Sequence, residues 1–195
     1  MSEMNRVAWN DGQWLNPPAQ VVNDGNELLV TAAEGSDFWR TTSYGFIHDD
    51  GHALLRPLAD GTAVEVSWVL EYVEQFDQAG VIVRGDESTW IKAGVEFCDG
   101  DAQLGAVVTR QVSDWSVAPV GDWFNELVTV RASLSGDAVT IRARVGSGAW
   151  RLVRVAPWPT GLAARAGPMI CAPTRAGLTV RFTNWLVGPA DTELH

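Results

Sequence analysis

Long hydrophobic runs are missing from this sequence of 195 residues. No stretch approaches the roughly 18 consecutive apolar residues that a membrane-spanning helix needs, so we expect no such helix. The segment from Met1 to Asp11 is polar with Trp9 among it, and it lacks the apolar core of a signal peptide. We therefore expect a cytoplasmic protein with no membrane partner.

Cysteine is nearly absent as well, because the chain holds only Cys98 and Cys171. Without a secretory signal, so few cysteines are by default free thiols in a reducing compartment. We expect no disulfide between them.

Clusters of basic residues are also lacking. The chain has 14 Lys and Arg against 24 Asp and Glu, which gives a formal net charge of -10. The basic residues are nearly all arginine and are scattered along the sequence. Such a chain repels nucleic acid and anionic membranes unless a local basic patch intervenes, so we expect no nucleic-acid partner.

Apolar and aromatic side chains are plentiful. Hydrophobic residues make up 46% of the chain and charged residues 19%, which allows a sizeable core and argues against disorder. The ten tryptophans are unusual for this length. Core filling should explain about half of them, since each buries a large area, and the others could stack against a flat or amphipathic ligand.

Alternation of polar and apolar residues dominates the chain, and helical periodicity is nearly absent. Strands bounded by Gly, Asn and Asp clusters are predicted over residues 27–33, 63–74, 77–84, 89–98, 104–110, 127–133, 138–145, 150–155 and 178–187. Short strands at regular spacing predict an all-β sandwich or barrel. No linker or internal repeat divides the chain, so we expect one domain over residues 1–195.

The hairpin loop at residues 85–89 predicts the register of the two strands beside it. Counting outward from this loop gives four facing pairs: Arg84 with Trp90, Ile82 with Lys92, Gly80 with Gly94, and Gln78 with Glu96. These side chains share one mixed face, whereas the opposite face is purely apolar and must be core. A tryptophan and paired glycines favour a binding groove over a plain solvated face.

The charges of this face indicate what a groove there could hold. Lys92 near Arg84 and Trp90 would make one end basic and aromatic, which suits an anionic or heavily hydroxylated ligand. Glu96 could be hydrogen bonded to Gln78 across the strand pair. The alternative is a structural polar network beneath loops.

Several motifs along the chain form a recognisable series. They are Asp37-Phe38-Trp39-Arg40, Tyr44-Gly45-Phe46, Asp50-Gly51-His52, Phe76-Asp77-Gln78-Ala79-Gly80-Val81, Trp90-Ile91-Lys92-Ala93-Gly94-Val95-Glu96, Ser113-Asp114-Trp115-Ser116, and Pro168-Met169-Ile170-Cys171-Ala172-Pro173 followed by Gly177 and Phe182. These motifs resemble those of one widespread family that includes the fungal regulation-of-enolase protein. They come in the expected order, and the resemblance extends from about residue 9 to residue 187.

The resemblance implies a concanavalin A-like fold, in which two antiparallel sheets form a jelly-roll sandwich with one concave face. Other members of that superfamily bind or cleave carbohydrate on this face, but the family has no settled activity, and fold alone does not deliver function. The implied groove residues are Trp39, Arg40, Tyr44, His48, Gln78, Arg84, Trp90, Lys92, Glu96, Thr109, Asp114 and Trp115. The alternation supports five of these independently: Gln78, Arg84, Trp90, Lys92 and Glu96.

Glycosidase chemistry needs two acids facing each other across a groove. The common glucanases of this fold carry them in a Glu-x-Asp-x-(x)-Glu pattern on one strand, and this pattern is missing. Glu96 stands alone on its strand, with Asp99 in the following turn. Glu96 together with Asp77 or Asp114 is the remaining arrangement for a catalytic pair.

Other reactive constellations are weak. His48 and His52 have the spacing of a zinc motif, but that motif requires a helix and this segment is a Gly-containing loop. Cys98 has no base near it in sequence, so a buried inert thiol is favoured over a nucleophile. There is no phosphate-binding glycine loop and no dinucleotide fingerprint. We expect no metal and no cofactor.

Three functions are consistent with these features. The first is a non-catalytic binding module for a carbohydrate or related polar small molecule in a Trp-lined concave groove, and we favour it over an enzyme. The second is an enzyme acting on a glycoside or polyol-like compound with Glu96 as acid or base. The third is a protein-interaction module in the regulation of sugar metabolism.

Overall fold

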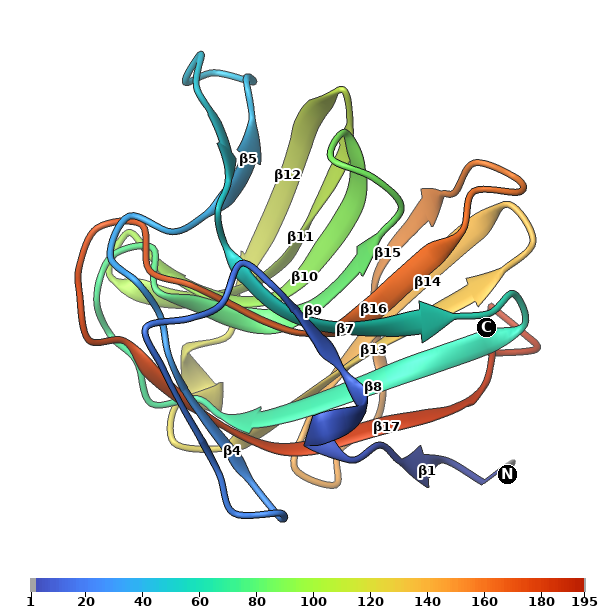
Figure 1. The fold of residues 1–195 in the computed structure, drawn as a ribbon, viewed down its shortest axis with the longest axis horizontal. Coiled ribbons are helices and arrows are strands. Elements are labelled where there is room, and N and C mark those ends of the chain that lie inside the picture. Colours follow the sequence, from blue (N-terminus) through green and yellow to red (C-terminus); the bar gives the residue numbers. More distant parts are fainter. Residues whose placement is uncertain (1–2, 195) are drawn as a thin grey trace.

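The computed structural model describes residues 3–194, and in it two antiparallel sheets pack face to face (Figure 1). Within this range, the eight-stranded sheet runs in the order β15 (Arg151–Pro157), β14 (Ala138–Val145), β13 (Leu127–Ser135), β8 (Thr62–Val69), β17 (Thr179–Pro189), β4 (Leu28–Thr31), β3 (Gln20–Asn23), with β1 (Asn5–Arg6) also on β17. The seven-stranded sheet runs β12 (Val112–Pro119), β11 (Asp101–Arg110), β10 (Thr89–Cys98), β9 (Gln78–Arg84), β16 (Ala164–Cys171), β7 (His52–Leu58), β2 (Gln13–Leu15). The fold is the predicted jelly-roll sandwich.

A separate hairpin and two short turns complete the described chain. β5 (Phe38–Arg40) pairs with β6 (Ile47–Asp49) outside both sheets. The 3-10 turns η1 (Trp9–Asp11) and η2 (Gly121–Trp123) are the helical segments found in this part of the chain. Among residues 3–194, no helix has the length and apolar character to cross a membrane.

The main core lies between the two sheets and is built by alternation. Every second residue of β9 and β10 faces inward, and the inward set is apolar, as predicted: Ala79, Val81, Val83, Ile91, Ala93 and Val95. Five of the ten tryptophans fill the same core: Trp9, Trp68, Trp123, Trp158 and Trp185. Burying such large apolar surfaces is the main favourable contribution to folding, which accounts for the expected half of the tryptophans.

The predicted register of β9 and β10 is confirmed at each of its four facing pairs. The strands predicted over 89–98 and 138–145 have the observed bounds, and the others start and end within a few residues of the observed ones, with one exception. The prediction over 63–74 is too long, because the chain leaves the sheet after Val69, where the Leu70 N–H donates to Glu126 O. Tyr72 is still buried there, so the apolar pattern outlasts the strand.

Several strands were not predicted, and β16 shows why. It holds a central place between β9 and β7, yet it contains Gly167 and Pro168, which normally exclude a central strand. Its pairing with β7 is interrupted between Ala166 and Met169, so the missing proline N–H is accommodated at that break. β12 was missed because it is a largely exposed edge strand with mixed residues.

A row of glycines crosses three neighbouring strands of the seven-stranded sheet. Gly80 lies opposite Gly94, which lies opposite Gly105. A Cβ atom on Gly94 would come within 2.1 Å of Ala79 O, and one on Gly80 within 2.1 Å of Ala93 O. The neighbouring backbones therefore leave no space for side chains, and the row forms the bare floor of the concave face.

Replacing Gly94 with alanine should destabilise the protein by about 2–4 kcal/mol or prevent folding, because backbone atoms cannot give way as a flexible side chain can. Gly148→Ala is the control, since that glycine is exposed in a turn and its new Cβ would lie 3.0 Å from Val145 O. Urea unfolding should show a change of about 1 kcal/mol or less for the control. Equal stability of the two variants would contradict this account of the floor.

Candidate functional site

The hairpin of residues 38–49, which contains β5 and β6, stands beside the upturned strands β10–β12 of the seven-stranded sheet (Figure 1). Its first two side chains, Phe38 and Trp39, are buried in a second hydrophobic cluster on the concave face. The cluster also contains Trp90 and Met169 from the sheet. Phe38 lies across Trp90 with ring centroids 5.9 Å apart. Apolar packing thus fixes the base of the hairpin on the sheet.

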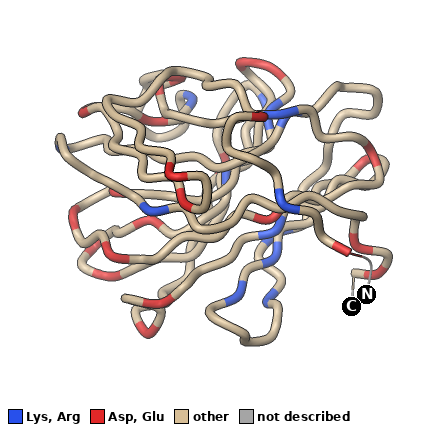
Figure 2. The backbone as a smooth tube through the Cα atoms, turned by 60° about the horizontal axis from the view of Figure 1, so that its bottom comes forward, with Lys and Arg blue, Asp and Glu red and all other residues tan. Residues whose placement is uncertain are grey.

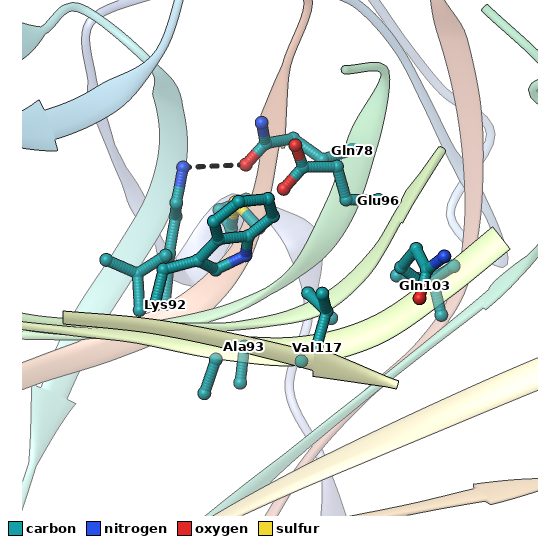
Figure 3. A pocket seen from close by; sticks show the side chains of 13 residues that line it. Gln78, Lys92, Ala93, Glu96, Gln103 and Val117 are labelled. Carbon is teal, nitrogen blue, oxygen red and sulfur yellow. Dashed lines mark hydrogen bonds between the residues drawn. The ribbon is translucent and has the colours of Figure 1, made fainter. Parts of the chain in front are cut away.

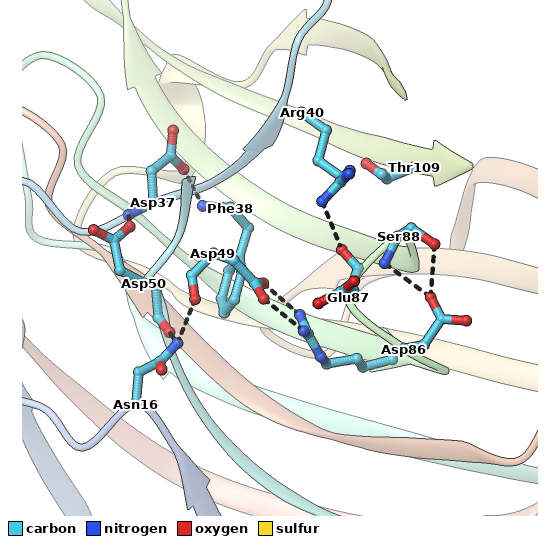
Figure 4. Close-up of polar contacts among 12 residues, drawn as sticks. Asn16, Asp37, Phe38, Arg40, Asp49, Asp50, Asp86, Glu87, Ser88 and Thr109 are labelled. Carbon is cyan, nitrogen blue, oxygen red and sulfur yellow. Dashed lines mark hydrogen bonds and ion pairs between the residues drawn. The ribbon is translucent and has the colours of Figure 1, made fainter. Parts of the chain in front are cut away.

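Polar contacts hold the rest of the hairpin in place (Figure 4). Arg84 of β9 donates to both carboxylate oxygens of Asp49 at 2.6 and 2.7 Å, a bidentate pair with defined geometry. Arg40 belongs to the hairpin itself, and its guanidinium donates to the backbone oxygens of Gln111 and Glu87 in the loops of the seven-stranded sheet. Two of the expected ligand-binding arginines are therefore engaged in positioning the hairpin.

Lys92 makes the third contact between sheet and hairpin region. It is the only lysine in the chain and is 4% exposed. Its Nζ donates to Asp37 Oδ1 at 2.8 Å and to Gln78 Oε1 at 2.7 Å. Burial by itself favours the neutral amine, but the nearby carboxylates, Asp37 foremost, outweigh it and raise the pKa of Lys92 above its ordinary value. Lys92 is therefore a fixed cation in the floor of the site.

A pocket of about 300 Å³ lies between this hairpin and the concave face. Its lining consists of Gly35, Asp37, Trp39, Tyr44, Phe46, His48, Phe76, Gln78, Lys92, Glu96, Val107, Trp115, Pro173 and Thr174. Beside it, a smaller hollow of about 20 Å³ continues along the glycine row towards Gln103 and Val117 (Figure 3). The larger pocket, at about 300 Å³, is at the lower end of the range of about 300–1,000 Å³ that is typical of small-molecule sites.

One wall of the pocket is a continuous series of aromatic rings. Trp115 of β12 meets Trp39 edge to face at 6.4 Å, and Trp39 meets Tyr44 in the same way at 5.6 Å. Tyr44 stacks on Phe46 at 5.3 Å, and Phe46 meets His48 at 5.0 Å. Tyr44 and Phe46 are 56% and 43% exposed, so the pocket presents aromatic surface to its contents and to solvent.

Glu96 differs from its charged neighbours because its carboxylate accepts no hydrogen bond from any residue within 3–194. Figure 3 shows it beside Gln78, whose amide is already used: its oxygen accepts from Lys92, and its Nε2 donates to Phe76 O. The expected Glu96–Gln78 bond is thus not formed. Burial raises the pKa of Glu96 to about 7, and Lys92 opposes that rise only in part.

The structure places seven of the twelve expected groove residues around the pocket: Trp39, Tyr44, His48, Gln78, Lys92, Glu96 and Trp115. The other five lie elsewhere, and two of them, Arg40 and Arg84, hold the hairpin in place. Thr109 is 1% exposed and bonds the Ser113 hydroxyl, which in turn accepts from the Arg40 N–H. Asp114 pairs with Arg154 at 3.0 Å, two-thirds exposed at the sheet edge.

Trp90 does not line the groove, contrary to the prediction that it would offer a ring to a ligand. It is 0% exposed beneath Phe38 and so presents no surface for binding. Alternation correctly placed it on the concave face, but it could not show that the hairpin covers that end. Trp90→Ala should therefore act as a core truncation, at a cost of about 3–5 kcal/mol.

Sequence reasoning missed several pocket residues: Gly35, Asp37, Phe46, Phe76, Val107, Pro173 and Thr174. Asp37, Phe46, Phe76 and Pro173 lie within motifs that carried the family resemblance, so that signal was available. Val107 faces Lys92 across the β10–β11 pair, and extending the register by one strand would have found it. Gly35 and Thr174 lie outside those motifs, and their place at the pocket depends on tertiary structure alone.

The other candidate reactive groups have structural roles. His52 is buried: its Nε2 accepts from the Ala33 N–H, and its Nδ1 lies 2.8 Å from Asn16 O, so both nitrogens are used away from His48. Asp77 is buried against the Arg175 guanidinium and does not line the pocket. Cys98 and Cys171 are free and buried, as predicted, and burial raises the pKa of Cys98 to about 11.

Two antiparallel sheets, one of them concave with a pocket beneath a hairpin, define a concanavalin A-like sandwich. Over residues 14–190 the sequence matches the family described as "Protein of unknown function (DUF1349)". The chain belongs to this family, as the resemblance of its motifs predicted.

Known proteins similar to this chain agree with the assignment. It is 37% identical to Regulation of enolase protein 1 of Saccharomyces cerevisiae, over 100% of this chain and 98% of the relative. The crystal structure of a functionally unknown protein from Saccharomyces cerevisiae superposes with a TM-score of 0.89 at 36% identity, covering 96% of this chain and 100% of that one.

A more distant neighbour shares the fold alone. The crystal structure of xylan β-1,4-xylosidase from Bacillus halodurans C-125 superposes with a TM-score of 0.70 at 13% identity. It covers 96% of this chain but 40% of the xylosidase chain, so the similarity concerns one part of that enzyme.

Asp49→Asn should loosen the hairpin, because Arg84 loses its counter-charge. We expect a loss of about 1–3 kcal/mol, below the full cost of breaking a fully buried pair because Asp49 is one-third exposed. Opening would also free Lys92. Since this is the only lysine, an amine-reactive reagent read by mass spectrometry should add a label in the variant, with the α-amino group as internal reference.

Asp114→Asn is the control for that experiment. It also removes an Arg–Asp pair, but an exposed one whose arginine, Arg154, belongs to β15 and not to the hairpin, and it should cost about 1 kcal/mol or less. Lys92 should stay unlabelled in it. Protection of Lys92 in both variants would show that the Arg84–Asp49 pair does not hold the hairpin.

The raised pKa of Glu96 predicts a pH-dependent effect of Glu96→Gln. Between the ordinary value of 4.5 and about 7, the folded state keeps the proton and the unfolded state does not, so stability falls as pH rises. Glutamine mimics the protonated acid. Urea unfolding should show similar stabilities at pH 5 and a variant more stable by about 1–3 kcal/mol at pH 8. A difference independent of pH would mean that Glu96 titrates normally.

Proposed function

We propose that this protein binds a small hydroxylated molecule of the carbohydrate class in the pocket beneath the hairpin. The observation that carries the proposal is the pairing of an aromatic wall with a polar floor in a space for one small molecule. A sugar ring has an apolar face that packs against aromatic rings and hydroxyl groups that exchange hydrogen bonds. Trp115 and Trp39 can pack against the apolar face of the ring, and Glu96 and Thr174 can exchange hydrogen bonds with its hydroxyl groups.

The surroundings of the pocket support binding more than catalysis. Lys92 donates to both Asp37 and Gln78, so the floor is rigid and preorganised. The solved neighbour named as a xylosidase acts on a carbohydrate, but its similarity is limited to the fold and supplies only context.

A screen of sugars by thermal shift tests the proposal, because a ligand that binds the native state raises its stability. Trp115→Ala should weaken binding of a sugar found in this way by at least about tenfold, or about 1.4 kcal/mol, since it removes a partly exposed ring of the wall. Trp150→Ala is the matched control, because Trp150 stacks on Arg144 and does not line the pocket. Equal affinity in the two variants would place the ligand elsewhere.

A second candidate function is acid–base catalysis on a glycoside or polyol-like compound. It is favoured by one observation: an acid with a pKa of about 7 faces a pocket that also contains the carboxylate of Asp37. Hydrolysis of aryl glycosides by wild type, abolished in Glu96→Gln, would establish it. Saturable sugar binding without turnover would leave the binding function alone.

A further inference from the structure

The charges that line the pocket do not balance. The floor contributes Asp37, Lys92 and Glu96, and the Lys92–Asp37 contact of 2.8 Å pairs two of them. Glu96 is left without a donor within residues 3–194, although it lies in the same polar floor (Figure 3). The pocket thus presents one carboxylate for which the described residues supply no hydrogen-bond partner.

Glu96 is partly buried, and a partly buried carboxylate without a partner is commonly compensated by a cation that also donates hydrogen bonds. The protein could have offered one from Arg84 or Lys92, which share the concave face. Both are already committed, Arg84 to Asp49 and Lys92 to Asp37 and Gln78. Neither cation of this face is therefore free to pair with Glu96, and a ligand can supply the missing cation.

The aromatic wall favours the same kind of group. Faces of tryptophan and tyrosine attract a cation through their electron-rich centres, by about 0.5–2 kcal/mol depending on hydration. Trp115, Trp39 and Tyr44 form that wall next to Glu96. A net charge of -10, spread over loops around the molecule (Figure 2), also attracts cations and repels anions.

An anionic ligand, one of the two ligand classes expected from sequence, fits this pocket poorly. That expectation rested on Arg84 and Lys92 as free donors, and both are neutralised. A phosphate or carboxylate group would face Glu96 and Asp37 with little to offset the repulsion.

We infer that the ligand carries a protonated amine, which pairs with Glu96 against the Trp115–Trp39–Tyr44 wall. The inference rests on the proposed function and narrows it from hydroxylated molecules in general to amino sugars. Glu96 fixes the amine, while the pocket of about 300 Å³ beside it leaves room for the ring.

Three sugars that share one ring separate the amine from the hydroxyl groups: D-glucosamine, its neutral N-acetyl derivative, and D-glucose. Each is titrated at pH 7 and equal ionic strength, with tryptophan fluorescence as readout. Glucosamine should bind at least about tenfold more tightly than the other two, which corresponds to about 1.4 kcal/mol. Glucose 6-phosphate, as the anionic arm, should bind more weakly than glucose.

Glu96→Gln keeps the shape of the side chain and removes its charge, so the preference for glucosamine should fall to about twofold or less. Glu126→Gln removes one charge at an exposed position outside the pocket and should keep the preference. A change common to both variants would reflect net charge alone and would overturn the role of Glu96.

The outcomes distinguish the inference from the function on which it rests. Equal binding of glucosamine and glucose, each lost in Trp115→Ala, would overturn the inference and leave sugar binding intact. Binding of choline in a Glu96-dependent manner, without binding of any sugar, would support the cation site and overturn the carbohydrate assignment. Tighter binding of the 6-phosphate would overturn the inference directly.

Discussion

Two ion pairs determine the shape of this site, Arg84 with Asp49 and Lys92 with Asp37. In each, a cation on the concave face reaches a carboxylate in or beside the hairpin of residues 38–49. Without them, the concave face would be an open groove with free positive charges. With them, the hairpin covers one end, the positive charges are neutralised, and a small enclosed pocket replaces an extended surface. The position of Trp39, Tyr44 and Phe46 around that pocket follows from this docking.

The parts of the structure that depend on neighbouring residues in sequence could be predicted. Alternation gave the β9–β10 pair, its register and the identity of its two faces, because period and register are local properties. The family motifs gave the sandwich and seven of the pocket residues. The local pattern did not predict strands whose place depends on tertiary structure. One of them is β16, which lies centrally in its sheet despite Pro168, because its pairing with β7 is interrupted at that residue.

The function of individual charged residues could not be predicted, because that depends on long-range partners. Arg84 and Lys92 had the composition of an anion site, and sequence could not show that Asp49 and Asp37 would meet them across 35 and 55 residues. For the same reason Trp90 was placed on the correct face but assigned the wrong role, since Phe38 covers it. Glu96 was correctly chosen, and its lack of a partner became visible only in three dimensions.

The glycine row and the hairpin differ in how far their residues can be substituted during evolution. Any side chain at Gly80 or Gly94 collides with backbone, so substitution there is closed to every residue type. Residues 41–47 of the hairpin are all exposed, so their side chains can be exchanged without a clash with backbone. New ligand preferences among members of this fold are therefore free to arise through changes in the hairpin, on a floor whose shape the backbone alone dictates.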